Sequence, residues 1–214
     1  MQSRNLLVLP LVLALSACSS TYYNAWEKVG VHKRDILVSR VENTRDAQQD
    51  AQTEFKDALE QFGSIVTIQE TSLKKAYDKL SGEYDDSVDA AEEVSDRIDS
   101  VQSVAEALFK EWEDEIKQYN NAEFKRQSAS QLRDTRSRYG SMLKSMRASE
   151  ASMKPVLQTF KDNVLFLKHN LNAQAIGSLR GEFSSLQDDI GVLIEEMNRS
   201  IAESNAFIEQ LQSS

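Results

Sequence analysis

Few residues in this chain have the types and spacing that chemistry requires. Its 214 residues include one cysteine, Cys18, and two histidines, His32 and His169. A single thiol cannot close a disulfide within the chain. The sequence has no His-Glu-x-x-His motif and no glycine-rich phosphate loop, and it gives no basis for a Ser-His-Asp triad. We therefore predict that the protein is not an enzyme and has no catalytic residue, cofactor or metal site.

Two other residue groups could bind metals, and each has a simpler interpretation. Met142, Met146 and Met153 share one helical face, where thioethers could bind Cu(I), but their spacing favours packing in a core. Carboxylates occur in runs such as Glu92-Glu93 and Glu113-Asp114-Glu115. Runs of this kind are typical of a solvated helix face, and a loose divalent-cation surface is the alternative.

The first seventeen residues have the pattern of an export signal. Arg4 gives a basic start, Leu6 to Leu15 form an apolar stretch, and Ser16-Ala17 are small. Ten apolar residues are too few to cross a bilayer, which needs about twenty, and Pro10 interrupts a helix there. We interpret residues 1–17 as a signal peptide that is removed.

The cleavage zone, Leu15-Ser16-Ala17-Cys18, resembles the bacterial lipobox. This resemblance implies cleavage between Ala17 and Cys18 and lipidation of the Cys18 thiol, and several acyl chains make a stable membrane anchor. Ser19 follows the cysteine, where aspartate would favour retention in the inner membrane. The implied location is the inner leaflet of the outer membrane, with the protein facing the periplasm.

Residues 18–32 then form an anchor and juxtamembrane segment. Tyr22, Tyr23 and Trp26 follow the anchor closely, and aromatic side chains of this kind sit well at a membrane interface. They could equally cover the end of the domain that follows, near Trp112 and Tyr119. Both interpretations can hold together.

After residue 30 the apolar residues follow alternating steps of three and four. Four such runs extend from Leu37 to Phe62, from Leu73 to Tyr119, from Leu132 to Leu167 and from Ile176 to Leu211. This is the heptad pattern of packed helices. The chain has only 7 Gly and 2 Pro, against about fifteen and ten at average usage. Few corners are therefore expected.

Three breaks separate these runs. We expect a turn in residues 63–70, at Gly63, although a stutter in one continuous helix is the alternative. Asn120-Asn121 and Asn170 to Gln174 mark the other two breaks, with Asn120 and Glu123 in a capping-box pattern. Short connections make successive helices antiparallel. We predict an all-α fold, an elongated antiparallel bundle or coiled coil of three to four long helices, forming one domain over residues 33–214.

Charge predicts how the second and third helices pair. Residues 83–115 are strongly acidic and residues 125–154 are mostly basic. Folding the chain back at Asn120-Asn121 brings the two arms together, with the alternative that both are solvated faces. The expected interhelix pairs are Glu106 with Arg136, Asp99 with Lys144, and Asp96 with Arg147.

Three stretches resemble an uncharacterised family of bacterial coiled-coil lipoproteins, a domain of unknown function: Lys33 to Val41, Ala107 to Glu113, and Val164 to Asn172. The resemblance implies the fold and no activity.

The function we expect is that of a structural or interaction protein, a scaffold or adaptor in the cell envelope. Its partners would be the membrane, through the N-terminal lipid, and an envelope protein. The net charge of −9 argues against nucleic acid. The alternative is a periplasmic binding module, either a chaperone-like holdase or a bundle that binds a small ligand or metal. Polar seam residues such as Gln48, Glu115 and Asn163 could set register within one chain or in a homo-oligomer.

Overall fold

The computed structural model describes residues 33–67, 73–170 and 173–213. These residues form four long helices, α2 (Lys33–Thr67), α3 (Leu73–Gln118), α4 (Ala122–His169) and α5 (Ala173–Ser213), and the described part of the chain contains no strand. At 1.5 Å per residue, the 46 residues of α3 and the 48 of α4 are each about 70 Å long. None of these helices has an apolar stretch long enough to cross a membrane.

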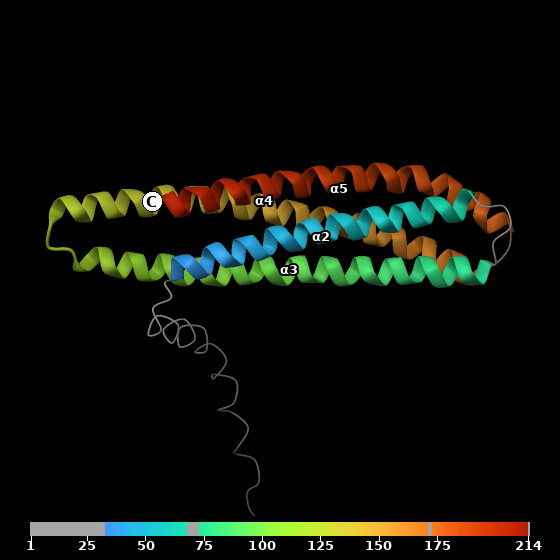
Figure 1. Cartoon of the computed structure of the whole chain (residues 1–214), viewed down its shortest axis with the longest axis horizontal. Helices are drawn as coiled ribbons and strands as arrows, with labels where there is room; N and C mark the ends of the chain where they lie inside the picture. The colour runs from blue at the N-terminus through green and yellow to red at the C-terminus, as the bar shows by residue number, and fades with distance from the viewer. Residues whose placement is uncertain (1–32, 68–72, 171–172, 214) are drawn as a thin grey trace, which may run out of the picture.

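The helices form an elongated antiparallel bundle (Figure 1). Each helix packs against two others, in the cyclic order α2, α3, α4, α5 and back to α2. This arrangement confirms the predicted all-α class. It follows from the short connections, which place each helix beside its neighbours in the sequence.

The core follows the predicted seams closely. All eight seam residues of the first run are buried in α2, and Met142, Met146 and Met153 of α4 are also in the core. The third and fourth runs likewise supply most of the buried residues of α4 and α5. A seam with steps of three and four stays on one side of a helix, so it can face the neighbouring helices over many turns.

The breaks lie near their expected positions. α2 ends at Thr67, and α3 begins at Leu73 and runs antiparallel to it (Figure 1), so the first two runs are two helices and not one continuous helix. Asn121, and not Asn120, is the N-cap of α4, since its side chain accepts hydrogen bonds from the amides of Glu123 and Phe124. Pro155 does not end α4, which continues to His169.

Gly63 does not mark the turn, as the sequence suggested, because it lies inside α2. A Cβ atom at Gly63 would lie 3.1 Å from the Phe183 ring of α5. Glycine therefore allows α2 and α5 to approach closely at this level. The five other glycines of the described helices have no neighbour within 4 Å of such an atom, so close packing does not explain them.

The hairpin of α3 and α4 extends beyond the other two helices. In Figure 1 its connection lies past both the first residue of α2 and the end of α5. Lys33 at the start of α2 pairs with Glu111 of α3 at 2.9 Å, and α3 continues for seven residues beyond that level. The predicted seam residues Glu115 and Tyr119 are exposed. Glu115 borders a hollow with Lys33 and Arg34 at the start of α2 and Leu211 near the end of α5, and Tyr119 lies beyond α3, in its connection to α4.

Candidate functional site

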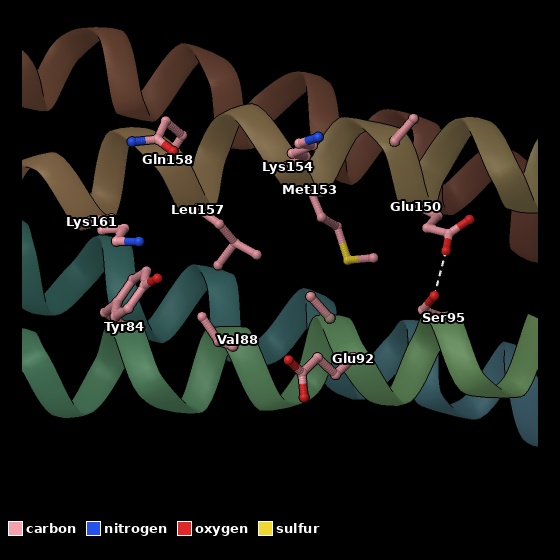
Figure 2. A pocket seen from close by; sticks show the side chains of 12 residues that line it. Tyr84, Val88, Glu92, Ser95, Glu150, Met153, Lys154, Leu157, Gln158 and Lys161 are labelled. Carbon is pink, nitrogen blue, oxygen red and sulfur yellow. Dashed lines mark hydrogen bonds between the residues drawn. The ribbon is translucent and has the colours of Figure 1, made fainter. Parts of the chain in front are cut away.

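A surface hollow lies between α3 and α4 (Figure 2). It has a volume of about 540 Å³. Two small residues, Ala91 of α3 and Ala151 of α4, leave room between the helices, and Val88, Met153 and Leu157 contribute apolar surface. The full lining consists of Tyr84, Val88, Ala91, Glu92, Ser95, Glu150, Ala151, Met153, Lys154, Leu157, Gln158 and Lys161. We call this hollow the α3–α4 groove.

Polar side chains border the two ends of the α3–α4 groove. At one end the Ser95 hydroxyl donates a hydrogen bond of 2.6 Å to Glu150. Tyr84 and Lys161 line the other end (Figure 2). An apolar floor between charged borders suits an apolar side chain presented by another protein.

A network of charged groups extends from the Ser95 end of the groove. Arg147 donates to Glu150 at 3.0 Å and also pairs with Asp99 of α3. Burial alone would lower the pKa of Arg147, but its hydrogen bonds to Asp99 and Glu150 raise it. The network joins α3 to α4 and holds the Glu150 carboxylate at the groove.

The interhelix ion pairs differ from the predicted ones. Arg147 pairs with Asp99 rather than Asp96, and Arg136 pairs with Glu113 rather than Glu106. Lys144, expected beside Asp99, is exposed. The charged arms of α3 and α4 do lie together, but each pairing is shifted toward the α3–α4 connection.

The direction of helical side chains explains this shift. Side chains lean toward the N-terminus of their own helix. The arginines of α4 therefore lean toward the connection, and the carboxylates of α3 lean away from it. An arginine consequently meets a carboxylate whose Cα atom lies one or two turns closer to the connection.

A buried polar layer crosses the middle of the bundle. The Gln48 side-chain nitrogen donates to Ser149 of α4 at 2.7 Å and to Ser200 of α5 at 2.9 Å. Gln52 donates to Asn198 at 2.9 Å. Gln48 therefore sets register within one chain. Asn163 is also buried, and it bonds the Thr159 carbonyl of its own helix.

Two titratable side chains have pKa values displaced by their surroundings. Burial raises the pKa of Tyr139 to about 12, and the nearby Glu106 adds to this rise. Burial also raises the pKa of Glu83, together with the neighbouring Asp86 and the acidic residues Asp57 and Glu54 of α2. Tyr139 packs edge-on against Phe109, and neither group lines the α3–α4 groove.

The remaining candidate residues are far apart or outside the described residues. His169 is exposed at the end of α4, and the described residues contain no group of three His, Cys, Asp or Glu side chains placed to hold a metal ion. Ala17, Cys18, Tyr22, Tyr23, Trp26 and His32 all lie outside the described residues. The α3–α4 groove could not be predicted from the sequence, because it depends on which residues of α3 and α4 line the space between the two helices.

A family model described as a protein of unknown function, DUF2959, matches residues 22–211. The chain belongs to the DUF2959 family. The match covers all three stretches that carried the resemblance, and it confirms the expected uncharacterised family. No curated protein and no solved structure matches the chain. Membership in DUF2959 adds no activity, substrate or partner.

Proposed function

We propose that this DUF2959 protein is a lipid-anchored lipoprotein of the outer membrane that faces the periplasm and acts as a scaffold or adaptor, without enzymatic activity. The observation that carries this proposal is the continuous core, in which fully buried residues extend from Leu37 and Phe62 in α2 to Leu179 and Leu193 in α5. Among the described residues, Met142, Met146 and Met153 pack in the core, and His169 is exposed. A rigid rod of this kind suits a spacer or docking surface.

The proposed anchor is the acylated Cys18 thiol. From Cys18 to Lys33 the chain has fifteen steps, which span at most about 50 Å when fully extended. Such a tether would hold the start of α2 close to the membrane, and the rod of about 70 Å would reach into the periplasm.

A Cys18→Ser variant tests the anchor. We expect the parent protein to sediment with outer membranes and to have a mass increased by acyl chains on its new N-terminus. The variant should lose both properties, while its helical circular dichroism stays unchanged because the four described helices begin only at Lys33. Parent protein found unacylated and in the soluble fraction would refute the anchor.

The α3–α4 groove supports a second candidate function, a binding module. Its apolar floor and charged ends could receive part of a partner protein or a small ligand. A holdase with splayed arms fits less well, because the four helices already bury their apolar faces against one another.

Photo-cross-linking in intact cells tests the adaptor role. A photoreactive residue at Ala151, in the α3–α4 groove, should give a specific cross-linked product. The matched control is Gly140, which is exposed on α4 and has open space around it. Equal products from both positions would exclude the groove as the contact. No product from positions on any face of the rod would refute the adaptor role.

A further inference from the structure

The free end of the α3–α4 hairpin presents two exposed aromatic side chains, Tyr119 and Phe124, that lie outside the core of the described residues. We call residues 112–128 the α3–α4 tip. It begins about one residue beyond the level at which Lys33 pairs with Glu111, and it projects roughly 10 Å farther along the rod. Figure 1 shows the connection between α3 and α4 beyond both α2 and α5.

Two aromatic side chains lie at the end of the α3–α4 tip. Tyr119 is 43% exposed and Phe124 is 56% exposed, which makes Phe124 nearly as exposed as any large apolar residue of the described chain. An amphipathic ring and an apolar ring, both exposed at one end of a molecule, suit the boundary between lipid and water.

The α3–α4 tip is held in shape before it meets any partner. The Trp112 indole nitrogen donates to Ser128 at 2.8 Å, which joins the two helices below the aromatic pair. The Asn121 side chain caps α4. Little conformational entropy would therefore be lost when the tip docks.

The charges of the α3–α4 tip largely neutralise one another. Lys117 pairs with Asp114 at 2.7 Å, and Arg126 pairs with Glu123. These pairs are local to each helix. A partner of the α3–α4 tip would therefore be bound by apolar contacts with the exposed rings, and not by attraction between opposite charges.

The position of the tether indicates which surface the tip would meet. The chain enters the bundle at Lys33, at the same end as the tip, after fifteen steps from Cys18. A tether of at most about 50 Å easily allows a tip that projects roughly 10 Å farther to reach the plane of the anchor.

We propose that the α3–α4 tip docks on the lipid surface beside the acylated Cys18, an inference that rests on the proposed anchor. The protein is then attached to the membrane at two points, through the acyl chains on Cys18 and through Tyr119 and Phe124. The long axis of the bundle points away from the membrane, with the α3–α4 tip at the lipid surface.

A spin label tests this docking in the acylated, full mature protein on vesicles of phosphatidylethanolamine and phosphatidylglycerol. Cys18 is acylated, so a cysteine introduced by Asn120→Cys is the only thiol that reacts. We expect the label at 120 to lose access to a water-soluble nickel chelate and to retain access to oxygen. The matched control is Lys168→Cys, about 70 Å away at the other end of α4, which should keep full access to nickel.

A second variant separates docking from folding. Adding Tyr119→Ser and Phe124→Ser to Asn120→Cys should restore nickel access at 120, with no change in helical circular dichroism, because both side chains are exposed. Phe166→Ser, which removes an exposed ring near the far end of α4, should not change nickel access at 120.

The outcomes distinguish this proposal from the anchor itself. Protein that floats with the vesicles but keeps a nickel-accessible label at 120 would overturn only the tip proposal. A label shielded from both reagents and broadened by a neighbouring spin would assign the tip to a second copy, which also overturns it. If the mature protein isolated from cells carries no acyl chains and does not float with the vesicles, both proposals are overturned.

Discussion

Tyr139 is a titratable residue whose burial makes the stability of the protein depend on pH. Its hydroxyl is buried without a hydrogen-bond partner, and its pKa is raised to about 12. In the unfolded chain tyrosine ionises near pH 10. Tyr139 therefore contributes fully to stability below pH 10, and this contribution is lost as the pH rises from 10 to 12, because ionisation then favours the unfolded state.

We predict that Tyr139→Phe flattens the alkaline fall in stability. Urea unfolding at several pH values between 10 and 12 should show a smaller loss in the free energy of unfolding for the variant than for the parent. Other tyrosines and lysines titrate in both proteins, so the difference between the two curves isolates Tyr139. At pH 7 the variant should be at least as stable, since an unpartnered buried hydroxyl is removed. Parallel curves would contradict the assignment.

The polar layer at Gln48 gives a second prediction at this scale. Gln48→Ala should lower the free energy of unfolding by about 2–4 kcal/mol, because it leaves a cavity and removes two hydrogen bonds. Gln48→Met fills similar space and also removes a side-chain oxygen that is buried without a partner. It should cost about 1 kcal/mol or less.

Urea unfolding of both Gln48 variants provides the measurement, and Gln131→Ala on the exposed face of α4 is the control. A methionine variant as unstable as the alanine variant would show that the hydrogen bonds, and not the filled volume, stabilise this layer.

Which residues are buried could be predicted from sequence better than which residues pair. Seam positions such as Leu37, Phe62 and Leu193 follow from helical period alone, and they are buried. The partners of Arg136 and Arg147 depend on the lean of side chains and on the geometry of the connection. The predicted pairs came from counting residues outward from Asn120-Asn121. That count ignores both the lean of side chains and the geometry of the connection, so it assigned the wrong carboxylate to each arginine.

At the scale of the helices, two glycines allow the effect of side-chain packing on stability to be separated from the effect of helix propensity. Gly63 is in α2 with the Phe183 ring 3.1 Å from where a Cβ atom would lie, whereas Gly140 of α4 has open space. Alanine in a helix interior is favoured over glycine by about 1 kcal/mol. Gly140→Ala should gain most of this value in free energy of unfolding.

Gly63→Ala should gain less than Gly140→Ala, or lose stability, because Phe183 must move by a few tenths of an ångström. Phe183 also packs edge-on against Phe62, which resists that movement. Thermal unfolding of the two variants in parallel gives the ranking. An equal gain for both would show that the α2–α5 contact adapts freely.

The position of Gly63 also shows why helix ends were harder to predict than helices. Glycine is the commonest residue where a helix ends, so a turn at Gly63 was the reasonable prediction. The buried residues Ile65 and Val66 continue α2 beyond it, and Arg180 of α5 donates to the Val66 carbonyl at 2.6 Å. Packing against another helix therefore determines where α2 ends.

At the scale of the whole molecule, the bundle consists of a four-helix body and a two-helix tip. In the body each helix has two neighbours, and buried residues recur at every turn. In the tip nearly all residues from Asp114 to Gln127 are exposed, and Ser128 is the first buried residue of α4. The heptad pattern of α3 continues from the body into the tip without a change, so the boundary between body and tip could not be predicted from it.

We predict that this division appears in native-state hydrogen exchange. Amides of residues 113–127 should exchange through local opening, with much lower protection than amides of residues 142–160, which should exchange only on global unfolding. The reason is that opening the tip exposes little apolar area, whereas opening the body exposes the buried methionines and Phe160. Ser128→Ala removes the hydrogen bond from Trp112 and should lower protection in the tip without changing it in the body. Equal protection along all of α4 would mean that the hairpin unfolds as one unit with the body. In that case the tip would be stabilised by contacts other than those between α3 and α4.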